Sequence, residues 1–473
     1  MMMFEPRRQH PVAAITNVLK IVREMIVPLI IFLLVGRGGE MSTTAYISVL
    51  SVFVLVMLIW GIADWMFFRF RIEDDELRIE YGIFVKKKLY IPRHRVQVID
   101  VTAGPIQRLF GLVSLQVQTA GETKPEAEIS AITRDIAGRI RTELMPEEAE
   151  QELADDTEEN NARYLATRRI SRKHLLIAAT TSGSFGVVLS ILGTIFAQAE
   201  HVIDESEVQQ FLEQVAQTGT QVLIYAAILM VILAWLLALL GTLIRFAGFT
   251  VNKKKDELVI QRGLFERKTM TIPYKRIQAV RIVEGILRQP FGYATLYVES
   301  AGFGDEGGQS TVLFPLIHRS KIQNFINEMV PEYNDAAELI KPPPRAITRY
   351  IIKTSTPVLI VAGVLAYFVF ESYFPLLLAV IGVIWGILRF RDARIGTTDK
   401  TLVMRFRRLA RTTAFIKRYR IQAADASSSP LQRRRDLISV TATVASGSSG
   451  TSFTVDELET DYREDFISWV ANV

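Results

Sequence analysis

Three short runs of basic residues have the side-chain type and spacing that best suit binding of an anion. They are Lys86-Lys87-Lys88, Lys253-Lys254-Lys255 and Arg433-Arg434-Arg435. A basic residue close to an anionic membrane surface contributes about 1 kcal/mol of attraction. We therefore treat the three runs as candidates for contact with lipid or with a partner protein. The alternative is that they are solvated turns, and the sequence favours neither interpretation.

Patterns typical of catalysis and of metal binding are missing. The sequence has no cysteine, which excludes disulfides, thiolate catalysis and iron–sulfur clusters. Its five histidines are scattered, and no two have the spacing of metal ligands. The glycine-rich stretch 302–308 is not followed by the Gly-Lys-Ser/Thr of a phosphate-binding loop, so a flexible turn explains it better. We expect a protein that is not an enzyme and has no cofactor and no metal.

The elements that must position the basic runs begin with six apolar stretches of about the length that crosses a bilayer, which takes about 20 residues. They cover residues 21–35, 46–67, 175–197, 222–244, 351–370 and 374–388. The stretch 222–244 has no charge and no polar face, so a buried helix of a soluble protein does not explain it. The first stretch is broken by Arg23 and Glu24 and needs its flanks to span. No small-residue cleavage site follows it, so we expect it to be retained.

The distribution of Lys and Arg around these stretches predicts their orientation. The connection between the first two stretches carries only Arg37, and the connection 198–221 carries several acids and no Lys or Arg. Basic residues gather at the opposite ends, for example at Arg7, Arg245 and Arg389. By the positive-inside rule, both termini and all large polar segments are expected on the cytoplasmic side of the cell membrane.

A motif with the pattern Ile-x-x-x-Arg-(Val/Ile)-Gln occurs three times, which indicates an internal repeat. Its residues are Ile91, Pro92, Arg95 and Gln97, then Ile272, Pro273, Arg276 and Gln278, then Ile416, Arg420 and Gln422. Without a gap, Phe110-Gly111 then matches Phe291-Gly292, whereas the third copy holds Arg435-Asp436 at that place. Each copy is also preceded by one pair of apolar stretches. The motif and the apolar pairs therefore indicate three tandem repeats of one unit.

Each polar segment is expected to form several short antiparallel strands closed by one amphipathic helix. In the first copy, the acidic turn 73–75 lies between two strand-like runs, and residues 112–119 alternate between apolar and polar. Apolar residues then fall on one helical face of the segment 133–144. Such an order predicts a small barrel or sandwich with a helical plug. Phe110 and Phe291 are either core residues, whose replacement by alanine should destabilise each domain by several kcal/mol, or surface binding residues.

With its repeated Ile-Pro-x-x-(Arg/Lys)-(Val/Ile)-Gln and Phe-Gly motifs, the chain resembles bacterial membrane proteins with pleckstrin-homology-like (PH-like) domains, and its three-fold form is similar to the YdbT type. The resemblance covers nearly the whole chain and is weakest in the third copy. It implies an α+β multi-pass membrane protein of three tandem units. Each unit would be a transmembrane helical hairpin followed by a PH-like barrel or sandwich with a C-terminal helix. It also implies no enzyme activity.

The expected organisation places hairpins at residues 1–67, 169–244 and 349–388. PH-like domains follow at 68–146, 245–333 and 389–473, with an acidic linker at 147–168 and a second linker at 334–348. On this organisation the motif residues are structural, and the three basic runs are the candidate lipid or partner contacts.

Two function classes remain. The first is a membrane scaffold or binding protein for envelope maintenance, whose partners are membrane lipids and another membrane or cytoplasmic protein, which could be a same-family PH-like protein. The alternative is a small membrane transporter or transporter subunit, but the apolar stretches carry almost no charge near their middle. Nucleic acid is not an expected partner, because 55 Lys and Arg against 50 Asp and Glu make no dense basic field.

The predicted orientation can be tested with alkaline phosphatase fusions, because this enzyme is active only after export. A fusion after Gln209 should be active and a fusion after Asp156 inactive. The reverse pattern of activities would contradict the orientation.

Overall fold

The computed structural model describes residues 6–35, 43–119, 126–144, 164–183, 186, 188–191, 193–194, 220–300, 310–335, 337–368, 374–446 and 450–471. Two compact units divide the chain. The first is Met1–Tyr164, Arg169–Thr250 and Val259–Thr271; the second is Leu165–Arg168, Val251–Leu258 and Ile272–Val473. The stretch 302–308, residues 198–219 and residues 147–163 of the predicted linker lie outside the described residues.

Paired apolar helices precede the strands of each copy. They are α1 (Val12–Val35) and α2 (Thr43–Phe67), α6 (Arg172–Thr180) and α9 (Thr220–Phe246), and α11 (Ile347–Phe368) and α12 (Leu378–Asp392). Three segments of the described residues are long and apolar enough to cross a bilayer: Ile47–Phe67, Ile224–Phe246 and Pro344–Val364. Many of their large apolar side chains are exposed, Tyr225 and Leu229 among them, which is the arrangement that a lipid environment requires.

Two of the predicted stretches differ from the helices observed. The stretch 175–197 does not begin as one long helix, because α6 ends at Thr180. The hydroxyl groups of Thr180 and Thr181 donate to the Ile177 carbonyl at 3.1 and 2.6 Å, and such local bonds compete with helix continuation. The last stretch is the 15-residue α12, preceded by a short 3-10 turn at Phe374–Leu377.

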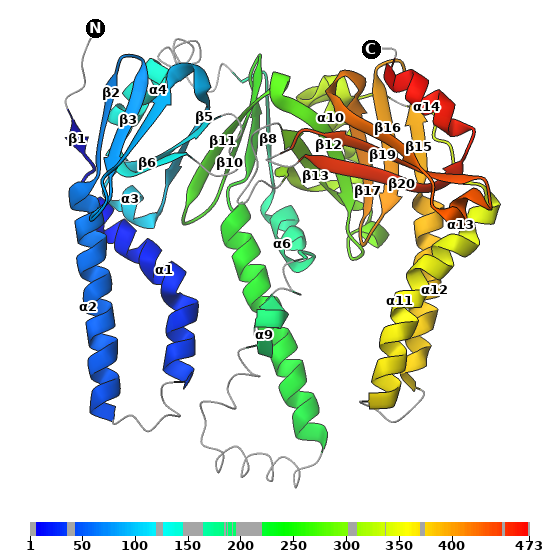
Figure 1. Ribbon diagram of the computed structural model, residues 1–473, viewed down its shortest axis with the longest axis horizontal. Coiled ribbons are helices and arrows are strands. Elements are labelled where there is room, and N and C mark those ends of the chain that lie inside the picture. The colour runs from blue at the N-terminus through cyan, green and yellow to red at the C-terminus, as the bar shows by residue number, and fades with distance from the viewer. Residues whose placement is uncertain are drawn as a thin grey trace. The chain divides into compact units, whose positions relative to one another are not determined.

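The third hairpin is packed closely, and its two helices run side by side away from the strands of the third copy (Figure 1). Gly382 and Gly386 lie one turn apart on α12 and face α11. A Cβ atom added at Gly386 would lie 2.6 Å from the Ile351 Cα atom. This spacing of small residues is typical of helix contacts in membranes.

The three polar segments share one topology, which confirms the three-fold repeat. Three strands, a 3-10 turn, one strand, a short helical turn, two strands and a final helix follow one another in each copy. The first copy consists of β2 (Arg69–Glu73), β3 (Glu76–Tyr81), β4 (Lys87–Pro92), η1 (Arg93–Arg95), β5 (Val96–Ala103), α3 (Pro105–Leu109), β6 (Leu112–Thr119), β7 (Ala127–Thr133) and α4 (Arg134–Leu144).

The later copies repeat this order. The second consists of β9 (Thr250–Lys253), β10 (Glu257–Arg262), β11 (Arg267–Pro273), η2 (Tyr274–Arg276), β12 (Ile277–Glu284), η3 (Gln289–Phe291), β13 (Tyr293–Ser300), β14 (Thr311–His318) and α10 (Arg319–Met329). The third consists of β15 (Arg394–Thr397), β16 (Thr401–Arg407), β17 (Arg411–Lys417), η7 (Arg418–Arg420), β18 (Ile421–Ser427), α13 (Pro430–Arg433), β19 (Leu437–Val444), β20 (Thr451–Glu459) and α14 (Tyr462–Ala471).

Before each hairpin, a short segment pairs with the first strand that follows it. The strand β1 (Arg7–Arg8) pairs with β2, and Ile340 forms an isolated bridge with Ile395 of β15. The strand β8 (Ala166–Arg169) is the corresponding segment of the second copy, where the Leu165 N–H donates to the Lys253 carbonyl at 2.9 Å. Each hairpin is therefore held at both ends by the domain that follows it.

The isoleucines of the motif belong to the core. Ile91, Ile272 and Ile416 are at most 1% exposed. Ile91 packs with Leu77, Leu115 and Ile140 in the first copy, and Ile416 belongs to the cluster of Phe453 and Phe466 in the third. The final helix of a copy contributes to each of these clusters, through Ile140 and Phe466.

Consecutive copies share their sheets, which the sequence did not indicate. Strand β5 of the first copy pairs antiparallel with β11 of the second, with Ala103 opposite Arg267. Strand β12 of the second copy pairs in the same way with β17 of the third, with Ala279 opposite Ile416. By the motif alignment, Ala103 corresponds to Glu284 and Arg267 corresponds to Arg411, and these residues are also paired. The two junctions therefore have the same strand register.

The Phe-Gly motif marks a tight turn between the fourth and fifth strands of a copy. Gly111 and Gly292 have φ values of +66° and +70°, a left-handed conformation that glycine adopts without a Cβ penalty. The third copy keeps this turn with Asp436 at φ +52°, and aspartate is one of the few other residues that tolerate it. The loss of Phe-Gly from the third copy therefore preserves the backbone.

Of the two alternatives for Phe110 and Phe291, the surface position is the one observed. They are 53% and 69% exposed, because the turn before the left-handed glycine carries them out of the domain.

Replacing Phe291 with alanine should therefore change the free energy of unfolding by less than about 0.5 kcal/mol. By contrast, Phe453→Ala removes a side chain that is 1% exposed and should cost about 3–5 kcal/mol. Thermal unfolding of the full chain in detergent measures both. An equal loss for the two variants would contradict the exposed position of Phe291.

Candidate functional site

Two kinds of loop in each copy lie next to the membrane helices. The turn between the second and third strands contacts the second helix of its own hairpin: the rings of Phe84 and Trp60 are 6.0 Å apart in the first copy. In the second copy the Leu264 N–H donates to the Ile244 carbonyl at 3.0 Å. In the third, the Trp385 indole N–H donates to the Arg408 carbonyl at 3.0 Å. The membrane helices thus fix which ends of the domains face the bilayer.

The same loops expose large apolar side chains. Phe84 is 84% and Leu409 71% exposed at the turn between the second and third strands. The connection between the fourth and fifth strands exposes Leu109, Phe110, Ile286, Leu287, Phe291 and Leu431. In the first copy this connection adjoins the start of α1, because Ile106 packs against Val12 and Ala13. Exposed apolar groups at these loops are suited to the headgroup layer of a bilayer.

A pocket of about 380 Å³ in the second unit is lined mainly by arginine. We call it the arginine pocket, and its lining residues are Gln289, Arg319, Leu388, Arg391, Asp392, Arg394, Arg405 and Arg411. Leu388, Arg391 and Asp392 come from the end of α12, so the pocket lies where the third hairpin leaves the membrane region.

Pairing of β12 with β17 builds one wall of the arginine pocket. Glu284 of β12 lies directly opposite Arg411 of β17, and its carboxylate accepts hydrogen bonds from the Arg411 guanidinium. Asp392 accepts a bond from Arg407 and lies 3.6 Å from Arg411. The two carboxylates are thus occupied by Arg407 and Arg411.

The other arginines of the pocket have no such partner. Among the described residues, no carboxylate lies within ion-pair distance of Arg319, Arg391, Arg394 or Arg405. Arg394 is directly opposite Arg405 in the β15–β16 pair, and like charges in that arrangement destabilise a sheet. The pocket therefore holds four positive charges that its own acids do not neutralise.

The surplus of positive charge affects the pKa of Arg405. Burial lowers the pKa of Arg405 from its usual value, and the positive charges of Arg411, Arg394 and Arg319 lower it further, against a raising effect of Glu284. Its Nε–H donates to the Thr413 hydroxyl at 3.1 Å, which holds the guanidinium in place. A bound anion would reverse the unfavourable interaction among these arginines.

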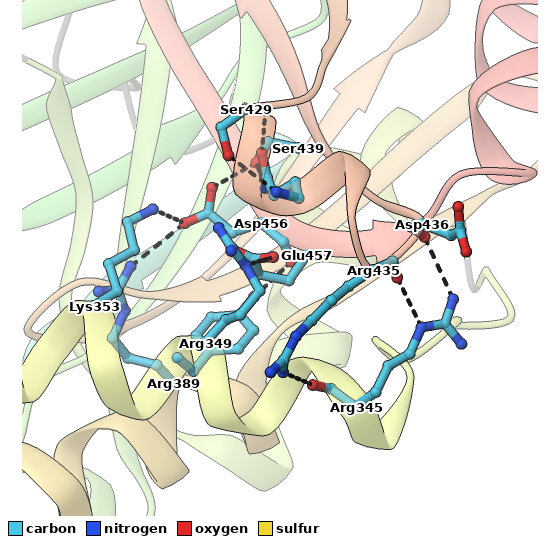
Figure 2. Close-up of polar contacts among 12 residues, drawn as sticks. Arg345, Arg349, Lys353, Arg389, Ser429, Arg435, Asp436, Ser439, Asp456 and Glu457 are labelled. Carbon is cyan, nitrogen blue, oxygen red and sulfur yellow. Dashed lines mark hydrogen bonds and ion pairs between the residues drawn. The ribbon is translucent and has the colours of Figure 1, made fainter.

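The basic residues at the entry of the third hairpin are engaged differently, as Figure 2 shows. Lys353 of α11 lies 2.9 Å from the Asp456 carboxylate, and Arg389 of α12 lies 3.6 Å from it. Arg349 pairs at 2.7 Å with Glu457, which is almost fully buried. These pairs fasten the hairpin to β20, so their charges are used inside the protein.

The three predicted basic runs occupy three different positions in their copies. The first run consists of Lys86 and the first two residues of β4, Lys87 and Lys88. The second run, Lys253, Lys254 and Lys255, ends β9 and forms the turn to β10. The third run, Arg433, Arg434 and Arg435, ends and follows α13.

Their contacts differ as well. Lys88 pairs with Glu80 at 3.5 Å on the surface, Lys254 with Glu257 at 3.0 Å, and Arg435 donates to the Arg345 carbonyl at 3.3 Å. The structure does not bring the runs into one shared site, and their role in lipid contact stays a prediction.

Among the motif residues, the isoleucines are core residues, and the prolines end their strands at the 3-10 turns η1 and η2. Arg95, Arg276 and Arg420 are the last residues of those turns and of η7. Gln278 is buried and donates to the Arg276 carbonyl at 3.0 Å, whereas Gln422 is exposed. Gln97 lies in β5. The isoleucines and Gln278 are thus buried, and the structural role of the motif residues stays a prediction.

The arginine pocket was missed by sequence reasoning, because its members are single arginines spread over residues 319–411 rather than a run. One signal was present: Arg405 and Arg407 alternate on β16, and a strand places alternate residues on one face. Their neighbours from β12 and α10 follow only from the pairing of two copies.

Two ionisable groups of the first hairpin, Asp64 and Lys20, have polar partners. The Asn17 amide donates to the Asp64 carboxylate at 2.9 Å, and Lys20 pairs with Glu128 of β7 at 2.8 Å. Among the described residues no group of three or more potential ligands could hold a metal ion.

Comparison with known proteins agrees with this architecture. The bacterial PH domain family matches residues 25–148, 188–330 and 350–471. The UPF0699 transmembrane protein YdbT of Bacillus subtilis (strain 168) is 33% identical over 99% of this chain and 98% of its own length. The UPF0699 transmembrane protein YdbS of the same organism is 29% identical over 76 residues, which are 16% of this chain and 46% of that protein. With three family matches on three copies of one fold, the chain is a membrane protein that belongs to the bacterial PH domain family.

Proposed function

We propose that the protein is a non-enzymatic scaffold of the cell membrane, which holds three PH-like domains at the cytoplasmic face and binds the anionic headgroups of the bilayer in the arginine pocket. The observation that carries this proposal is the surplus of four arginines beside the end of α12. Guanidinium groups bind phosphate through paired hydrogen bonds. A phosphate from the adjacent headgroup layer is therefore the natural counter-ion.

The exposed apolar loops support the same function. Side chains such as Phe84 and Leu409 would enter the interfacial layer and hold the domains at the depth of the headgroups. The arginine pocket would then meet lipid phosphates without a large movement of the domain. Its volume of about 380 Å³ accommodates a headgroup.

The cytoplasmic orientation of the domains belongs to this proposal and rests on the distribution of Lys and Arg. A second function as transporter gains no support from the first hairpin, where Lys20 and Asp64 are engaged near the domain. As a scaffold, the protein would offer its domain surfaces to another membrane or cytoplasmic protein while the arginine pocket holds lipid.

The double variant Arg394→Gln, Arg405→Gln tests the proposal in the full chain, purified in neutral detergent and stripped of lipid. Affinity for a short-chain phosphatidylglycerol, followed by native mass spectrometry, should fall at least about tenfold because two charge-assisted contacts are lost. Phosphatidylcholine should bind weakly to both proteins. Inorganic phosphate as a third probe shows whether the phosphate alone is recognised or the lipid is needed.

Folding of the variant can be followed separately. Removal of the Arg394–Arg405 repulsion should leave the melting temperature unchanged or raise it in the absence of lipid. Phosphatidylglycerol should raise the melting temperature of the wild type and not that of the variant. Equal affinity of both proteins for phosphatidylglycerol would exclude the arginine pocket as the lipid site.

The matched control is the triple variant Lys86→Gln, Lys87→Gln, Lys88→Gln, which removes the exposed run at the start of β4. Its loss of phosphatidylglycerol binding should be smaller and should disappear at high salt, because exposed charges are screened. A larger loss than in the arginine variant would move the site to the lysine run.

A further inference from the structure

Two strand edges of complementary kind are left open in this protein. Strand β4 is the last strand of the sheet β1-β2-β3-β4, and β18 is the first strand of the sheet β18-β19-β20. Among the described residues neither edge pairs with another strand. Open edges expose unpaired N–H and C=O groups and are templates for pairing with another chain.

The protein itself shows what each edge binds. The strand that corresponds to β18 is β5 in the first copy and β12 in the second, and these pair with β11 and β17 of the following copy. The strands β11 and β17 in turn correspond to β4. Among the described residues, β18 and β4 are thus the two strands of this kind that pair with no other copy.

Burial at equivalent positions shows the difference. In the paired strand β12, Gln278 is buried, and Ala279 and Val280 are 0% exposed. Their counterparts on β18 are Gln422 and Ala423, which are exposed, and Ala424, which is half-buried. Small side chains on β18 leave room for a strand to approach.

Charges on the two open edges are opposite. Asp425 is exposed on β18, and Lys87 and Lys88 are exposed on β4. At the established junction of the second and third copies, Glu284 of β12 pairs with Arg411 of β17. By the motif alignment, the counterparts of these two residues are Ser428 and Lys86, so the open edges carry their opposite charges at other positions than that junction does.

We propose that β18 of one molecule pairs with β4 of a second copy of the same chain, so that molecules join head to tail in the plane of the membrane. The register of the two internal junctions, carried over by the motif alignment, places Ala423 opposite Ile91 and Ala424 opposite Tyr90. Lys87 then lies diagonal to Asp425, within reach of a cross-strand ion pair. Such a heterologous contact generates a chain or a ring of molecules.

Cysteine cross-linking tests this arrangement cleanly, because the natural sequence has no cysteine. Two single variants, Ala424→Cys and Tyr90→Cys, carry different affinity tags and are reconstituted together in phosphatidylglycerol vesicles. Directly opposed residues of an antiparallel pair lie within disulfide distance. Oxidation should therefore give a dimer that carries both tags.

The double variant Val280→Cys, Phe415→Cys is the matched control for oxidation, because these residues are paired in the same register inside one chain. The mixture of Ala423→Cys with Tyr90→Cys is the negative control, since neighbouring residues of a strand point to opposite faces. Equal yields from the mixtures with Ala424→Cys and with Ala423→Cys would overturn the register. Absence of the doubly tagged dimer while the Val280–Phe415 control oxidises would overturn the proposal.

Exchange of the charges at Asp425 and Lys87 tests the proposed pairing independently. Asp425→Lys in the Ala424→Cys protein should slow cross-linking about two- to five-fold, as expected for a cross-strand charge pair. Lys87→Asp in the Tyr90→Cys protein should restore the rate. A chain that carries Ala424→Cys and Tyr90→Cys together should form oligomers, and a purely intramolecular disulfide would exclude the second copy as the occupant.

Discussion

The hydrogen-bonding demand of strand edges is the constraint on which this structure depends. In each copy the third strand has an outer edge that needs a partner, and so does the fourth strand. Pairing of β12 with β17 satisfies two of these edges. The same pairing brings Glu284 to Arg411 and carries the start of α10 and the end of α12 to one place. The arginine pocket therefore results from the backbone hydrogen bonds that join the second copy to the third.

A second constraint is the short connection from membrane helix to strand. Helix α2 ends at Phe67 and β2 begins at Arg69, and α12 ends at Asp392 with β15 beginning at Arg394. With one residue between helix and strand, the first and third domains stay close to their own hairpins. In each of these copies the loops beside the hairpin, with their exposed apolar side chains, therefore stay next to its membrane helices.

The repeat and the core followed from sequence because their signals are local. The motif isoleucines Ile91, Ile272 and Ile416 recur in one pattern, and all three are buried. The sequence does not reveal that Phe291 is exposed, because its exposure follows from the turn that the left-handed Gly292 allows. The arginine pocket depends on strand pairing between copies, and no property of Arg319 or Arg405 alone reveals its distant neighbours.

The common register of the two internal junctions has a consequence for the evolution of chain length. Deletion of the middle repeat from the gene would remove β11, the partner of β5, and β12, the partner of β17. The free edges of β5 and β17 would then fit each other, because β17 corresponds to β11 and β5 corresponds to β12. In the shortened protein, β5 could pair with β17 in the register of the two present junctions. The shortened protein would, however, lose Glu284, Gln289 and Arg319, and with them one side of the arginine pocket. The shared register thus makes strand pairing independent of the number of repeats, whereas the arginine pocket needs side chains of both the second and the third repeat.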